Sequence, residues 1–210
     1  MKKLVILLAL LLPAASFAQI NIEQIDDING YPAFIITYDN HIVDLNETRS
    51  LVGAKPLTET PEMMLKSKER AIWAANNLEE YGHEGMDLFM DRKKASENAA
   101  SNYGLYINTK SLVLADNKVN YIRTQVLESS RSSLNSYITY RASNSYNNSD
   151  GHYANRTNTS IDTRQLTSNQ WTECGNALIL FYKPGRTIED REGNKRKVTG
   201  YVVWHYELFQ

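Results

Sequence analysis

Cys174 is the one cysteine in the chain of 210 residues, and its thiol is the first side chain to consider as a nucleophile. A thiol hydrolase needs a thiolate beside a histidine that a third side chain orients. His205 or His152 would be the base here, and Glu207, which shares a strand face with His205, would orient it. No thiol-protease signature surrounds Cys174, and it begins no predicted helix whose N-terminus would lower its pKa. The sequence therefore favours a structural thiol, and a hydrolase using Cys174 remains the alternative.

The four histidines predict no metal site. His41 and Asp44 fall in a predicted hairpin, where strand alternation sends their side chains to opposite faces. Gly151 fits a calcium loop only with Tyr146 at position one and Thr157 at position twelve, where carboxylates are required. There is also no glycine-rich phosphate loop, so we expect neither a metal nor a cofactor. The lone cysteine excludes an intramolecular disulfide.

Aromatic residues are more suggestive of function, because the chain has thirteen tyrosines and three tryptophans. Trp73 lies opposite the apolar stripe of its predicted helix, so it is either covered by another segment or exposed for a partner. Tyr146, Tyr153 and Trp171 lie in or beside a segment rich in Asn, Ser and Thr, residues 143–170. Amphipathic rings with short polar neighbours suit the recognition of a protein or a carbohydrate. The alternative is a wet, tyrosine-rich surface that binds nothing.

The first eighteen residues are typical of a bacterial signal peptide. Two lysines precede the apolar run 4–12, and small residues end at Ala18, so we expect cleavage before Gln19. The run is too short to span a bilayer, which needs about 20 residues. No later segment is apolar enough to cross a membrane, so we expect a soluble protein in the periplasm or outside the cell.

Charge excludes a nucleic-acid partner. The formal net charge of −1 becomes −3 when the two lysines of the leader are removed. Binding to a phosphate backbone needs a clustered positive surface instead. The composition, 42% hydrophobic and 22% charged, is that of an ordinary globular protein.

One helical segment, about 61–95, is expected, and it carries Trp73. Thr60 is a good N-cap and Pro61 suits the first helical position, and an apolar stripe runs from Met64 to Leu78. A second, shorter helix is expected over 86–95.

Most other elements are predicted to be strands. Residues 21–32 are a polar lead-in, and 143–170 form a long loop or mobile surface segment. Pro184 and Gly185 are expected to turn the chain. The predicted strands are 33–38, 41–45, 103–107, 112–114, 119–127, 134–142, 177–182, 187–191 and 198–209.

Together these patterns predict a single α+β domain over 19–210, with an antiparallel sheet of five to eight strands and the helical segment packed on one face. The expected function is a non-enzymatic binding or interaction module, exported by a bacterium. The alternative is a cell-envelope hydrolase that uses Cys174 with a histidine.

Overall fold

The computed structural model has an α+β fold, as the sequence predicts. It describes residues 20–38, 41–80, 82–102, 146–168, 170–189 and 195–210. The strands form one six-stranded sheet with the order β1-β2-β5-β6-β4, and β3 pairs with β5 beside this path. All pairings are antiparallel except that of the two-residue β3 with β5. The elements are β1 (Ile20–Ile28), β2 (Tyr31–Tyr38), α1 (His41–Ser50), β3 (Thr58–Glu59), α2 (Pro61–Asn77), the 3-10 turn η1 (Met86–Leu88), β4 (Ser96–Asn102), α6 (Asp150–Thr157), β5 (Glu173–Glu189) and β6 (Lys195–Phe209).

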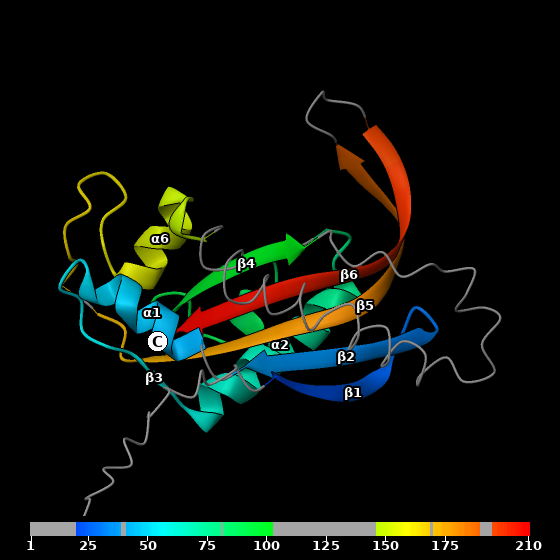
Figure 1. Cartoon of the computed structure of the whole chain (residues 1–210), viewed down its shortest axis with the longest axis horizontal. Coiled ribbons are helices and arrows are strands. Elements are labelled where there is room, and N and C mark those ends of the chain that lie inside the picture. Colours follow the sequence, from blue (N-terminus) through cyan, green and yellow to red (C-terminus); the bar gives the residue numbers. More distant parts are fainter. Residues whose placement is uncertain (1–19, 39–40, 81, 103–145, 169, 190–194) are drawn as a thin grey trace, which may run out of the picture.

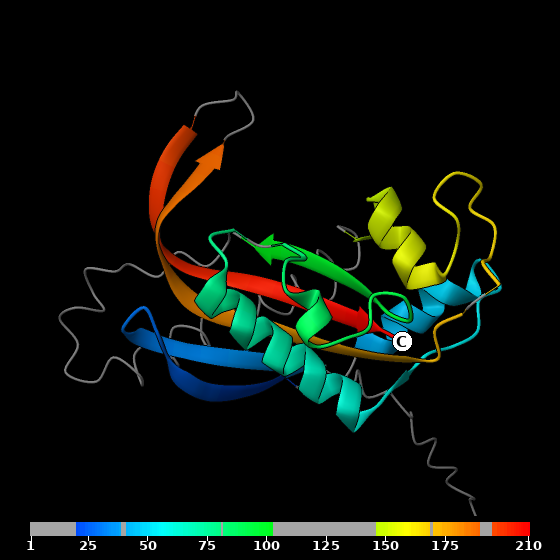
Figure 2. The same ribbon diagram turned by 180° about the vertical axis from the view of Figure 1, so that it is seen from behind.

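Helix α2 covers one face of the sheet (Figure 2). It begins as predicted, with the Thr60 hydroxyl accepting a hydrogen bond from the Met63 backbone N–H at 3.3 Å. Small side chains on its buried side let it lie close to the central strands β5 and β6. At Gly175 on β5 the approach is so close that a Cβ atom would collide with the Met63 backbone. The residues buried between α2 and the sheet include Ala71, Ala74, Ala75, Ile179, Phe181, Trp204 and Tyr206.

The opposite face is covered at one end by α1 and α6, which lie side by side (Figure 1). Strand alternation sends His205 and Glu207 of β6 to this face, together with Asn176 and Leu178 of β5. Asn98 of β4 lies opposite Glu207 and joins them. Polar and apolar side chains are therefore buried together under the two helices.

The predicted strand 41–45 is wrong, because these residues begin helix α1. Its buried residues His41, Leu45, Thr48 and Arg49 are spaced by four, three and one. This is a helical stripe, but three of its four members are polar, so a search for apolar periodicity does not detect it.

Three other local expectations are wrong. The predicted lead-in 21–32 contains β1, which turns into β2 through Asn29 and Gly30, both at positive φ. The predicted helix 86–95 is only the turn η1, followed by irregular chain. Pro184 and Gly185 do not turn the chain, because β5 continues past them with a shift of register between Lys183 and Arg186.

The segment 143–170 is not one long loop, because α6 forms within it. Ser149 precedes the helix and Asn158, at φ 53°, ends it in the left-handed conformation. The signal segment 1–18 with its cleavage site, and the strands predicted between 103 and 142, lie outside the described residues. No helix in the described ranges is long and apolar enough to span a membrane.

A buried polar cluster and a tryptophan-lined hollow

Glu207 is the centre of a buried polar cluster on the face beneath α1 and α6. Its Oε1 atom lies 2.8 Å from His41 Nε2 and accepts a hydrogen bond from Arg156 Nη2 at 3.1 Å. Its Oε2 atom accepts from the Asn98 amide at 3.0 Å. Burial raises the pKa of Glu207, but the charges of Arg156 and His41 outweigh burial and hold that pKa far below its usual range. The carboxyl group is therefore ionised.

His41, the first residue of α1, lies between two carboxylates. Its Nδ1 atom is 2.8 Å from Glu59 Oε1, and the same oxygen accepts a hydrogen bond from the Asn176 amide at 2.7 Å. Burial lowers the pKa of His41, but its hydrogen bonds to Glu207 and Glu59 raise it by more. An imidazolium donates from both nitrogens and so satisfies both carboxylates.

His205 differs from every other member of the cluster. Its side chain is fully buried, and among the residues that the structure describes neither of its ring nitrogens has a hydrogen-bond partner. Burial lowers the pKa of His205 to about 3, and the positive charges of His41 and Arg156 also lower it while Glu207 raises it. The ring is therefore neutral, with a free lone pair on one nitrogen. The Tyr146 hydroxyl donates to the backbone carbonyl of His205 at 3.2 Å, and not to a nitrogen of the ring.

Cys174 belongs to the same region but with a different histidine from the two that the sequence suggests. Its sulfur and the ligand atoms of His41 and Glu59 lie within 4.8 Å of one another. Burial raises the pKa of the Cys174 thiol, and Glu59 and Glu207 raise it further. A thiol that stays protonated is not a nucleophile. This arrangement favours the structural thiol over the hydrolase.

Arg49 lies between the polar cluster and the segment that carries Trp171. This fully buried side chain donates to the backbone carbonyls of Lys55 at 2.6 Å and Arg156 at 2.6 Å, and to Asn158 Oδ1 at 3.0 Å. Burial lowers its pKa to about 10, so the guanidinium remains charged. It therefore places a positive charge at the C-terminal end of α6, where the helix dipole favours one.

Trp171 lies beyond Arg49 and lines a hollow of about 590 Å³. Its Nε1 atom donates to the Asn155 carbonyl at 3.0 Å, and its backbone N–H donates to Asn158 Oδ1 at 2.9 Å. The polar edge of the indole is thus bound to α6. The residues lining the hollow are Lys55, Lys93, Lys94, Ser168, Gln170, Trp171, Thr172 and Gln210.

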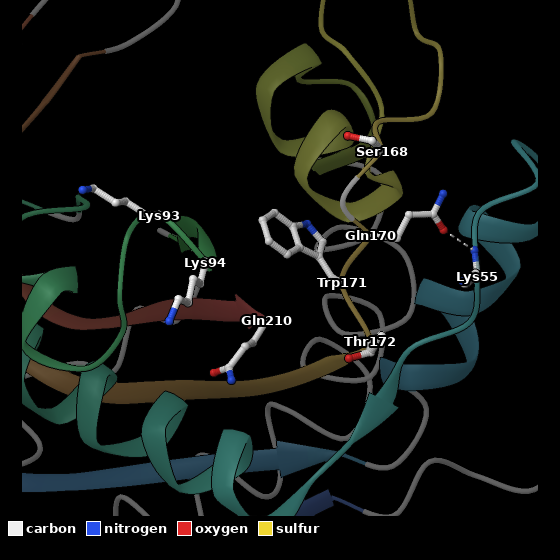
Figure 3. Close-up of a pocket in the computed structure, with 8 residues that line it drawn as sticks. All are labelled: Lys55, Lys93, Lys94, Ser168, Gln170, Trp171, Thr172 and Gln210. Atoms are coloured by element: carbon white, nitrogen blue, oxygen red, sulfur yellow. Dashed lines mark hydrogen bonds between the residues drawn. The ribbon is translucent and has the colours of Figure 1, made fainter.

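Figure 3 shows the side chains that line the hollow beside Trp171. Lys93 and Lys94 lie on one side of Trp171, and Lys55 and Gln170 lie on the other. Gln170 is held in place because its Oε1 atom accepts from the Lys55 backbone N–H at 3.0 Å. The hollow therefore combines one fixed aromatic ring with three exposed lysines.

The other three aromatic candidates are not placed to bind a ligand with Trp171. Tyr146 is fully buried. Trp73 is partly buried and packs against Phe89 and Gly85, and most of the polar segment after residue 127 lies outside the described residues. Tyr153 is half-buried beneath the Arg164 guanidinium, 5.1 Å from the ring centre.

No protein-family model matches the chain, and neither a curated protein nor a solved structure does. The chemistry of the two sites above is therefore the basis for the functional assignment.

Proposed function

We propose that the chain is exported by a bacterium and that its folded domain binds an acidic carbohydrate on Trp171. One observation supports the binding half: an indole and three lysines line the same hollow of about 590 Å³, and no side chain among the eight lining residues is acidic. Hollows of roughly 300–1,000 Å³ are typical of small-molecule sites. The export half depends on the signal sequence of residues 1–18.

The hydrogen bonds of Trp171 fix which part of the ring meets a ligand. Because Nε1 donates inward to Asn155, the carbon faces of the indole are what the ring offers to the hollow. Such a face packs against the C–H side of a sugar ring. Ser168, Gln170 and Thr172 supply neutral polar groups for the hydroxyls of the sugar.

The lysines decide which sugars are preferred. All three are exposed, so water screens each charge and each contributes about 1 kcal/mol or less. Lys94 is also 3.9 Å from Asp91, which balances part of its charge. We therefore assign most of the affinity to stacking on Trp171, and the preference for an acidic over a neutral sugar to the lysines.

Binding of uronic-acid trisaccharides tests this assignment. With the chain purified as its host processes it, calorimetry should show acidic trisaccharides binding more tightly than neutral ones of the same linkage. Trp171→Ala should weaken binding about tenfold, which is about 1.4 kcal/mol. The double variant Lys93→Gln/Lys94→Gln should weaken only the acidic ligands, and more so at low salt.

The matched control is Lys66→Gln, which removes a lysine of α2 paired with Glu62 and outside the hollow. It should leave every affinity unchanged. The proposal is abandoned if no acidic trisaccharide of the panel binds more tightly than its neutral partner, or if Trp171→Ala binds as the control does. Equal competition by inorganic phosphate would identify a phosphate site instead.

The intact mass of the exported protein tests the other half. We expect a mature N-terminus at Gln19, because the small residues before it suit a signal peptidase. A protein recovered outside the cytoplasm with residues 1–18 still attached would contradict the predicted cleavage. A protein found only in the cytoplasm would contradict export.

A further inference from the structure

We propose that His41, His205 and Glu207 form a binding site for a divalent first-row transition metal ion, for which zinc is the best fit. Their ligand atoms all lie within 4.8 Å of one another. The three side chains are at most 1% exposed. Two imidazoles and one carboxylate are a ligand set that zinc accepts readily and that leaves a position open for a further ligand.

His205 is the residue that points to a ligand. Buried polar side chains nearly always have a hydrogen-bond partner. The ring nitrogens of His205 have none among the described residues. The ligand atoms of His41 and Glu207 are close enough to His205 to share one ion with it. A neutral imidazole with a free lone pair is the form of histidine that binds a metal. A bound ion would therefore satisfy the one ring in the cluster that the protein leaves unsatisfied.

The surrounding hydrogen bonds match the outer shell of a metal site. A histidine ligand generally donates its second N–H to a carboxylate, which fixes the ring and makes it a better donor. His41 does this with Glu59 at 2.8 Å, and Asn176 in turn holds Glu59 at 2.7 Å. On the other ligand, the Asn98 amide holds Glu207 at 3.0 Å.

Distance and charge also fit an ion. Zinc bonds of about 2.0–2.2 Å place neighbouring ligand atoms roughly 3.4 Å apart in a tetrahedron, so the side chains need to move by only about 1 Å. In the structure His41 Nε2 and Glu207 Oε1 are 2.8 Å apart. A bound ion would take the place of the proton between His41 Nε2 and Glu207 Oε1, and the carboxylates of Glu207 and Glu59 supply negative charge beside it.

Zinc retention by the purified chain tests the proposal. After treatment with a chelator, the chain is given one equivalent of Zn²⁺, desalted and analysed for metal. We expect about one zinc per chain and a rise in melting temperature. His205→Phe should weaken zinc binding at least about 100-fold, more than the loss of an outer-shell residue, and Glu59→Gln about 10- to 100-fold.

His205→Phe is the decisive variant because it breaks no hydrogen bond of the described residues and replaces one ring by another. It should fold and melt like the metal-free wild type. The control is His83→Gln, since the rings of His83 and His152 are 6.5 Å apart and could bind zinc at the surface. His83→Gln should retain zinc as the wild type does.

The site is overturned by a wild-type chain that keeps no zinc after desalting, or by a His205→Phe variant that keeps as much as the wild type. Loss of zinc from His83→Gln with retention in the wild type would assign the ion to the surface pair. The metal site shares none of its residues with the hollow at Trp171, so either proposal can fail without the other.

Discussion

Glu207→Gln should destabilise the domain by about 3–5 kcal/mol, measured by urea unfolding at neutral pH in the presence of EDTA. The substitution keeps the size of the side chain but removes the one carboxylate that contacts both Arg156 and His41. Arg156 is 2% exposed, so its guanidinium would remain in the interior after losing its ion pair with Glu207. Breaking one partner of a buried ion pair typically has a cost of this size. Folded domains are stable by only about 5–15 kcal/mol, so the variant should be close to unfolding.

Two comparisons separate this effect from an ordinary loss of charge. Asp87→Asn breaks an ion pair with Arg92 that is exposed on both sides, and should reduce stability by at most about 1 kcal/mol. Adding Arg156→Met to Glu207→Gln also removes the buried guanidinium that has lost Glu207, and should restore part of the lost stability. The interpretation is wrong if Glu207→Gln is no more destabilising than Asp87→Asn.

Gly175→Ala should reduce stability by about 3 kcal/mol, at the upper end of the range for overpacked cores. The new methyl group would collide with the Met63 carbonyl and lie 2.7 Å from the Met64 backbone nitrogen. These are backbone atoms at the start of α2, so no side chain can rotate to make room. At roughly 2–4 °C per kcal/mol, the melting temperature should fall by about 6–12 °C.

Gly151→Ala is the matched control for this methyl group. Apart from its chain neighbours and the backbone of its own helix, nothing lies within 4 Å of the position of its new Cβ, and Gly151 lies in α6 without a positive φ. Alanine is the better helix former, so stability should stay the same or rise by up to about 1 kcal/mol. Similar melting temperatures for the two variants would show that α2 moves away from Gly175 and accommodates the new methyl group.

The parts of the fold that could be predicted are those whose signals are local. Thr60 and Pro61 mark the start of α2, and the unbroken apolar run 177–182 marks a central strand. The predicted stripe of α2 is nevertheless rotated, because Arg70 is fully buried against Glu97 while Leu65 is 55% exposed. A hydrophobic pattern cannot identify a buried face that contains an ion pair.

The candidate sites show the same limit. Alternation along β6 correctly predicted that His205 and Glu207 lie on one face. The aromatic and polar composition around Trp171 indicated that it was a candidate binding residue, and it lines the hollow. The partners of Glu207 come from positions 41, 98 and 156, and no local pattern brings such distant positions together. One missed signal was readable: Asn29-Gly30 between apolar residues is a strong hairpin indication and would have revealed β1.

The strand order has a consequence for how the protein is made. β5 and β6 are the last two strands in the sequence, yet they occupy the middle of the sheet. Ribosomes release a chain N-terminus first, so the hairpin of β1 and β2 emerges with nothing to pair against, and an isolated hairpin is marginal in water. The sheet can assemble only after nearly all of the polypeptide has been synthesised, since its pairings join residues far apart in sequence. The sheet of this topology is therefore completed only late in synthesis, which is compatible with the proposed export of an unfolded chain.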